Sequence, residues 1–162
     1  MSKLHFVTSG QRELLETALD LTESDGFMAD ARAIAAYLPR EGKDSELLGV
    51  AVFESFRGRR AEMHLGYTEG RNLTREMIQT LTLIAFHPRH FNLDTLLARV
   101  PVKNVNAICT LLKIGFEIEY RDRGSVAGNG DGIVLSLSRD DILASAGPSD
   151  SDYRPQMAEQ QE

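Results

Sequence analysis

The chain has 162 residues, a formal net charge of −6, a pI near 5.3 and 42% hydrophobic residues. This length suffices for one domain with a sizeable core. An acidic chain of ordinary composition does not favour nucleic acid as its main partner, because phosphate binding needs clustered Lys and Arg.

The cysteine content and the first residues indicate a compartment. A single cysteine, Cys109, excludes an intrachain disulfide and fits a reducing environment. The N-terminal residues lack the apolar segment of a signal peptide, and no apolar run approaches the roughly 20 residues that a membrane span needs. We therefore expect a soluble, cytoplasmic protein with no membrane partner.

The first quarter of the chain predicts one strand and two helices. Residues 4–8 form a short apolar run typical of a strand, and apolar residues at helical spacing follow it. Residues 29–38 predict a second helix, since their larger apolar residues fall on one side and Pro39 ends the segment. Residues 40–45 read as a polar loop.

The middle of the chain predicts a hairpin and a long helix. Residues 47–53 are apolar at almost every position, which fits a strand covered on both faces. Residues 57–60 read as a turn, and residues 61–68 then alternate between apolar and polar, as in a half-buried strand. Asn72 is a plausible cap for the amphipathic helix that Pro88 stops.

The last third predicts a strand, a helix and a closing hairpin. Residues 93–100 read as a strand, and Asn104 or Asn106 caps the next helix, which ends at Gly115. Residues 116–120 and 132–137 pair as the hairpin. We expect one domain over residues 1–143 and a disordered tail over residues 144–162, where Ser, Asp, Gln, Glu and Pro dominate. The order of elements favours a mixed, partly parallel α/β sheet with helices on its faces.

Two stretches carry a resemblance to a known family. Residues 104–116 read Asn-Val-Asn-Ala-Ile-Cys-Thr-Leu-Leu-Lys-Ile-Gly-Phe and follow an apolar strand. Residues 65–67 read Leu-Gly-Tyr, and residues 73–76 open the long helix with Leu-Thr-Arg-Glu. Over residues 47–137 the chain resembles the Gcn5-related N-acetyltransferase (GNAT) family. The helix start is similar to GNAT-type proteins that phages and prophages encode.

The resemblance implies an acyl-CoA N-acyltransferase fold, a central twisted mixed sheet with helices on both faces. It implies acetyl-CoA as the acyl donor and direct attack by an amine of a small molecule or a protein. A homodimer and a phage association, with the host cytoplasm as location, are further implications. The alternative is a catalytically inactive GNAT-fold protein of phage origin that acts through protein–protein interaction.

The same resemblance implies where the cofactor binds. Backbone N–H groups of the fourth strand face the thioester, and the start of the following helix attracts the pyrophosphate. Only one glycine, Gly70, remains of the glycines usual in that loop, and Glu69 and Glu76 add negative charge nearby. Asn104 matches a cofactor-contacting position, although a plain helix cap has the same appearance. The implied cofactor-binding residues are Leu65, Gly66, Tyr67, Arg71, Asn72, Leu73, Thr74, Arg75 and Asn104.

Three residues are candidates for the chemistry. His64 lies where relatives carry a residue near the acceptor amine, and an imidazole can exchange a proton near neutral pH. Glu62 shares its predicted face and could orient His64 or act through water. Many relatives carry a Tyr seven residues after the family Asn to protonate the thiolate, and here that position is Leu111. Tyr120 is then the candidate acid.

Each candidate also has a purely structural explanation. His64 and Glu62 could be solvated residues on the polar face of a strand. His87 and His90 flank a Pro turn, but without further ligands they do not predict a metal site. The sequence leaves the identity of the acceptor open.

Overall fold

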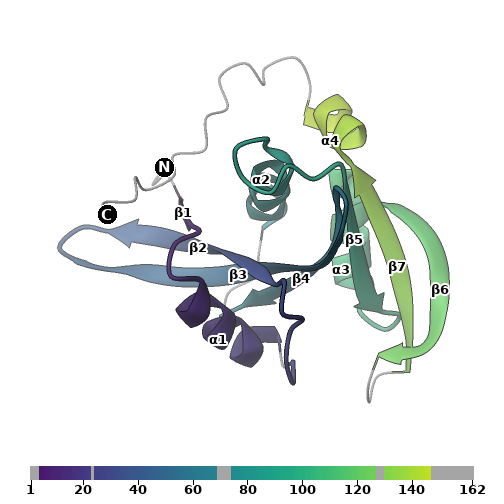
Figure 1. The fold of residues 1–162 in the computed structure, drawn as a ribbon, viewed down its shortest axis with the longest axis horizontal. Coiled ribbons are helices and arrows are strands. Elements are labelled where there is room, and N and C mark those ends of the chain that lie inside the picture. Colours follow the sequence, from purple (N-terminus) through teal and green to yellow (C-terminus); the bar gives the residue numbers. More distant parts are fainter. Residues whose placement is uncertain (1–3, 23, 69–73, 127–129, 147–162) are drawn as a thin grey trace.

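The computed structural model describes residues 4–22, 24–68, 74–126 and 130–146. Its strands are β1 (His5–Val7), β2 (Arg32–Arg40), β3 (Lys43–Arg57), β4 (Arg60–Tyr67), β5 (Thr95–Pro101), β6 (Glu117–Val126) and β7 (Gly130–Ser138). Its helices are α1 (Gln11–Thr22), α2 (Arg75–Phe86), α3 (Val105–Ile114) and α4 (Arg139–Ala146). These described residues form a mixed seven-stranded sheet in the order β1-β2-β3-β4-β5-β7-β6, with helices on both faces (Figure 1). This architecture confirms the predicted fold class.

The prediction of a helix over residues 29–38 is wrong, because most of this segment belongs to β2. β2 pairs with β1 on one side and with β3 on the other. Ala33 and Ala35 pack against the α1 side, while Ile34 and Ala36 enter the core on the opposite side. A strand buried on both faces is apolar at consecutive positions, and such a short run has no period that separates it from a helix.

The other predicted elements are confirmed with shifted bounds. The turn at residues 58–59 joins β3 to β4 as expected, and β3 begins earlier than predicted, at Lys43. Asn104 rather than Asn106 caps α3, and Gly115 ends it with a φ of 120°, which favours glycine. Thr74 caps α2, whereas the predicted cap Asn72 lies outside the described residues. Helix α4 was not predicted, and residues 147–162 of the expected tail lie outside the described part of the chain.

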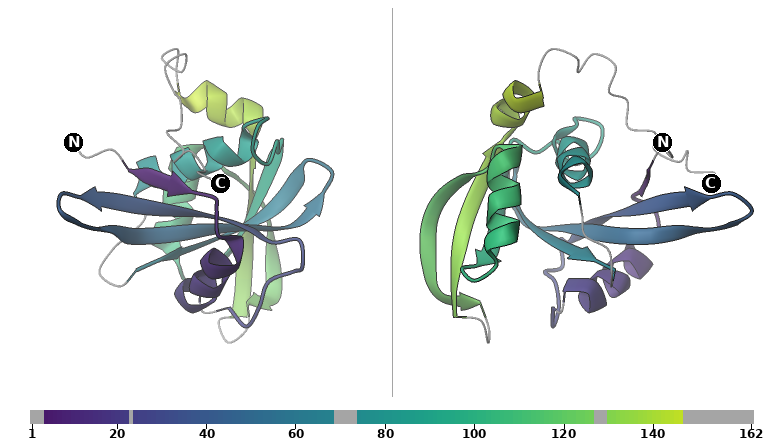
Figure 2. Two further views of the ribbon diagram at one scale, coloured as in Figure 1. Left: turned by 60° about the vertical axis from the view of Figure 1, so that its left-hand side comes forward. Right: turned by 180° about the vertical axis from the view of Figure 1, so that it is seen from behind.

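Helices cover the two faces of the sheet unequally (Figures 1 and 2). α1 packs on one face through Leu14 and Ala18, which contact a small cluster on β2 and β3. We call this side the α1 face. α2 and α3 lie on the opposite face, the α2 face, over a much larger cluster. No helix among the described residues is long and apolar enough to cross a membrane.

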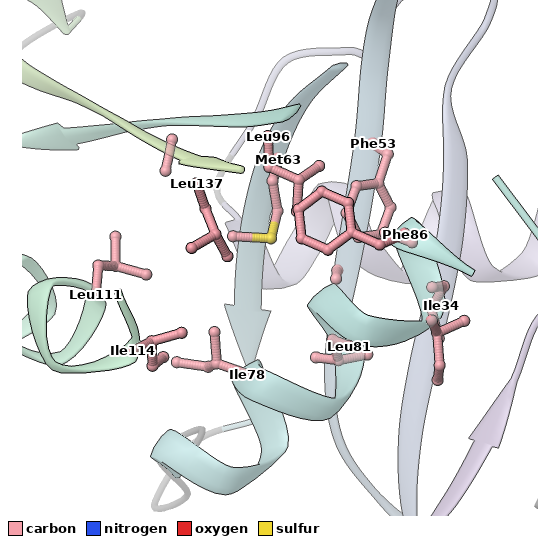
Figure 3. Packing of buried hydrophobic residues seen from close by; sticks show 14 of the residues in the cluster. Ile34, Phe53, Met63, Ile78, Leu81, Phe86, Leu96, Leu111, Ile114 and Leu137 are labelled. Atoms are coloured by element: carbon pink, nitrogen blue, oxygen red, sulfur yellow. The ribbon is translucent and has the colours of Figure 1, made fainter. Parts of the chain in front are cut away.

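The larger core joins the halves of the sheet (Figure 3). Met63 of β4, Leu96 of β5 and Leu137 of β7 meet side chains of α2 and α3 there. Leu96 and Leu137 are fully buried, and each such side chain contributes about 1.5–3 kcal/mol relative to an exposed one. The helices therefore hold together strands that their own backbone pairing joins only briefly.

That brief pairing is between β4 and β5, the parallel neighbours in the sheet. Their ladder runs from Arg60↔Thr95 to Met63↔Ala98 and stops there, although both strands continue. β4 stays paired with β3 up to Tyr67 without a register shift over residues 62–67, and β5 stays paired with β7 up to Pro101. We call the space between the diverging strands the fork, and the pair Met63↔Ala98 its last rung. In Figure 1 the two half-sheets run in clearly different directions.

Gly66 on β4 lets α1 approach the sheet closely. A Cβ atom at this position would lie 2.8 Å from Leu21 Cβ and 3.0 Å from the Leu21 carbonyl carbon. Both are atoms at or next to the helix backbone, so they cannot move aside as the end of a flexible side chain can. Glycine at residue 66 is therefore explained by the packing of α1.

We predict that Gly66→Ala lowers the free energy of unfolding by about 1–3 kcal/mol, as overpacking of a tight contact does. Gly26→Ala is the matched control, because a Cβ atom at Gly26 would meet no atom within 4 Å. Urea unfolding followed by circular dichroism measures both variants. Equal unfolding midpoints for the two variants would contradict the close approach of α1.

Candidate functional site

Backbone N–H groups of β4 point toward the fork. Thr68 N donates to Leu48 O on β3 at 3.1 Å, whereas Arg59 O accepts from Thr95 N on the β5 side at 3.2 Å. Backbone groups of successive strand residues point in opposite directions, so odd-numbered residues of β4 face β5. The N–H groups of Leu65 and Tyr67 therefore point into the fork, beyond its last rung. Such groups can polarise the carbonyl of a bound ligand.

Two helix N-termini lie at the same edge of the sheet as the mouth of the fork. β4 and β5 are parallel, and the chain leaves their carboxyl ends toward α2 and α3 respectively. At the start of α2, Thr74 Oγ1 accepts from Met77 N at 3.2 Å, and Arg75 is exposed. Helix N-termini favour anions, because their first N–H groups lack partners within the helix. This edge is suited to a phosphate-bearing ligand.

The predicted cofactor residues fall into three groups. Leu65, Gly66, Tyr67, Thr74 and Arg75 lie on β4 beyond the last rung or at the start of α2, and their cofactor roles stay predictions. Gly66 differs from its two neighbours, because its N–H group faces β3 and not the fork. Asn104 Oδ1 accepts from Ala107 N at 3.3 Å, so the structure gives Asn104 a capping role and leaves its cofactor role a prediction. The predicted positions 71–73 lie outside the described residues.

His64 is the first residue of β4 beyond the last rung, and its side chain lies on the α1 face. Its Nε2 is 2.8 Å from Glu54 Oε1, while Glu54 Oε2 accepts from Met28 N at 2.7 Å. A neutral imidazole beside an ionised carboxylate donates from Nε2, because the carboxylate only accepts, and that tautomer leaves the lone pair on Nδ1. The His64 side chain is 30% exposed, so part of it is open to solvent and to a ligand.

Glu54 was not among the predicted site residues. Its side chain is only 13% exposed, and its carboxylate orients His64. The predicted turn at residues 57–60 does not reveal it, because the hairpin contains a register shift between Glu54 and Arg57. Continued from Arg57↔Arg60 without that shift, Glu54 would face Met63, whereas in the structure it lies opposite Glu62, two residue pairs from Val52↔His64. Phe27, in the connection between α1 and β2, adds an apolar wall, with its ring centre 6.0 Å from that of His64.

Glu62 shares the α1 face with His64 but has a different partner. Its Oε1 accepts from Arg99 Nη1 at 3.0 Å, and Arg99 Nε lies 3.4 Å from Asp122 Oδ2. The carboxylate that contacts His64 is therefore Glu54, and Glu62 belongs to an ion-pair network across the sheet.

Tyr120 is not brought together with His64. It lies on the edge strand β6 opposite Val134 of β7, so a whole strand separates it from β5. Ordinary strand spacing puts the backbones of β6 and β5 about 10 Å apart. Leu111, at the position where the resemblance implies a Tyr as the acid, is buried in the core at 3% exposure.

Two shifted pKa values belong to other parts of the molecule. Hydrogen bonds from the Gly124 N–H and the Arg121 guanidinium lower the pKa of Asp131 in the β6–β7 hairpin. Burial and the neighbouring His87 lower the pKa of His90. Among the described residues, no group of three or more His, Cys, Asp or Glu side chains could hold a metal ion.

Comparison with solved structures places this geometry in a known fold. A variant of the spermidine N-acetyltransferase SpeG from Vibrio cholerae aligns with a TM-score of 0.71 at 16% identity, covering 90% of this chain and 99% of the other. A chimera of Vibrio cholerae SpeG and hSSAT gives 0.66 at 15%, covering 88% and 99%. Spermidine N-acetyltransferase from Vibrio cholerae, in complex with CoA and spermine, gives 0.61 at 18%, covering 80% and 76%.

No protein-family model and no curated protein matches the chain. At these identities the structural neighbours establish the fold alone. The chain has the acyl-CoA N-acyltransferase fold of the GNAT enzymes.

We predict that Glu54→Ala loosens the connection between α1 and β2, in which Met28 donates to Glu54. The Met28 amide would lose its charged acceptor, and such bonds contribute about 1.5–3 kcal/mol, so its hydrogen exchange should accelerate at least tenfold. Glu41→Ala, an exposed carboxylate at the β2–β3 turn, is the control. Amide exchange followed by NMR tests this, and unchanged exchange at Met28 would contradict the role of Glu54.

Proposed function

We propose that the protein is an N-acetyltransferase that moves the acetyl group of acetyl-CoA to an amine by direct attack. The observation that carries this proposal is the pairing of His64 with Glu54 just beyond the last rung of the β4–β5 ladder, where the fork opens. A proton acceptor then stands beside the place where backbone donors can hold a thioester.

The donor side of the proposal is the fork and the α2 face. The thioester carbonyl accepts from the N–H groups of Leu65 and Tyr67, which stabilise the oxyanion that develops. The pyrophosphate lies at the start of α2 near Thr74 and Arg75, where the helix dipole and a positive side chain favour an anion. Asn104, at the start of α3, is a further proposed contact to the cofactor at this edge of the sheet.

The acceptor side is the α1 face. The amine loses a proton to His64 Nδ1, its nitrogen attacks the carbonyl carbon, the new C–N bond forms and the C–S bond breaks. The CoA thiolate leaves, and water can protonate it, since neither Leu111 nor Tyr120 offers an acid at the fork. Glu54 keeps the imidazole oriented and stabilises its positive charge.

A small cationic amine is the acceptor that the site supports best. Glu54, Glu62 and Asp122 share the α1 face with only Arg99 as a fixed positive charge among these contacts. The structural neighbours are spermidine N-acetyltransferases, and one of them holds spermine. A protein amine, a homodimer, cytoplasmic location and a phage association remain predictions from the sequence.

Binding of acetyl-CoA is the first test. We expect a dissociation constant near the micromolar range by isothermal titration, weakened roughly fivefold or more in Arg75→Ala, as the loss of a charge-assisted contact predicts. Arg89→Ala, an exposed arginine in the α2–β5 connection, should bind normally. Absence of binding at millimolar acetyl-CoA would refute acetyl transfer and favour the non-catalytic binding protein.

Turnover with spermidine is the second test. We expect His64→Gln to lower kcat by roughly 100-fold at neutral pH, as the loss of a general base does, with little change in acetyl-CoA affinity. His87→Gln is the control, because His87 lies in the α2–β5 connection. Full turnover of His64→Gln between pH 6 and 9 would eliminate His64 as the base.

A further inference from the structure

Arg99 joins three strands at the last rung of the fork. It is the first residue of β5 after Ala98, and its guanidinium pairs with Glu62 on β4 at 3.0 Å and with Asp122 on β6 at 3.4 Å. Extending the register of the last rung by one residue places Arg99 across the fork from His64. The two side chains therefore stand on opposite sides of the fork, on the same face of the sheet.

The path of the Arg99 side chain depends on a glycine. β7 lies between β5 and β6, and a Cβ atom at its Gly132 would lie 3.0 Å from Arg99 Cγ. The same atom would lie 2.7 Å from Ser125 Oγ. Because residue 132 has no side chain, the Arg99 stem can cross β7 and reach Asp122.

On the α2 face, the burial of side chains stabilises the same rung. Met63 and Ala98 are 3% and 4% exposed and belong to the core beneath α2. Packing thus holds the rung from the α2 face, while the Arg99–Glu62 pair holds it from the α1 face. Beyond this point no pair of the β4–β5 ladder follows.

We infer that Arg99 is a positioning residue, a clamp that fixes where β4 and β5 separate and so sets the distance between the thioester and His64. The consequence for catalysis rests on the proposed function. A small displacement of reacting groups slows the chemical step while leaving remote binding contacts intact. Loss of the clamp should therefore lower kcat more than it weakens acetyl-CoA binding.

Hydrogen exchange of the ligand-free protein tests the clamp itself. Arg99→Met keeps an apolar stem and removes the charge, and we expect faster exchange over residues 60–67 than in the natural protein. Arg99→Lys should restore part of the protection, because it keeps the charge. Arg121→Met is the matched control, since Arg121 is an arginine on β6 that pairs with Asp131 instead.

Kinetics test the consequence. We expect kcat with spermidine to fall at least tenfold in Arg99→Met, with the acetyl-CoA dissociation constant changed less than threefold. Gly132→Ala should act in the same direction, because it displaces the stem without removing a charge. The double variant Glu62→Gln/Arg99→Met should be no slower than Arg99→Met alone, since both substitutions break the same pair.

The outcomes separate the two proposals. If exchange over residues 60–67 in Arg99→Met matches the Arg121→Met control, the clamp is overturned, whatever the kinetics. If exchange accelerates but the natural protein binds no acetyl-CoA, the clamp stands and the proposed function fails. If acetyl-CoA binds and kcat is unchanged in Arg99→Met, the positioning role is overturned.

Discussion

The rest of the structure depends on the early end of the β4–β5 ladder at Met63↔Ala98. Each half-sheet keeps its own pairing, so the cost of opening falls on the few backbone groups that face the fork. The buried side chains of α2 and α3 bridge the halves and compensate for the missing rungs (Figure 3). An open edge inside a sheet is stable here because the helices secure both sides.

The same place in the sheet concentrates charge. Glu54 and Glu62 lie directly opposite each other on β3 and β4, an arrangement of like charges that is unfavourable by itself. Each carboxylate has its own partner, His64 for Glu54 and Arg99 for Glu62. The two partners stand on opposite sides of the fork. The contacts that offset the repulsion between the carboxylates therefore orient both the candidate base His64 and the clamp Arg99.

Much of the fold could be predicted from the sequence because its signals are local. The turn at residues 57–60, the cap at Asn104 and the C-terminal Gly115 each act within a few residues. Residues 29–38 defied prediction because burial on both faces, a tertiary property, removes the alternation that marks a strand. The partners of His64 and Glu62 depend on register across strands, which sequence spacing specifies only once the pairing of the strands is known.

β4 also explains how donor and acceptor can be kept apart. Its even-numbered residues place the side chain of His64 on the α1 face, and its odd-numbered residues turn the N–H groups of Leu65 and Tyr67 into the fork. The α2 helix begins on the opposite side of the sheet, so in the proposed function a phosphate-bearing donor and a cationic amine would reach the fork from different faces. Because β4 has no bulge over residues 62–67, the alternation of its residues is enough to separate the His64 side chain from the N–H groups in the fork. The separation also requires that β5 diverges from β4 after Ala98.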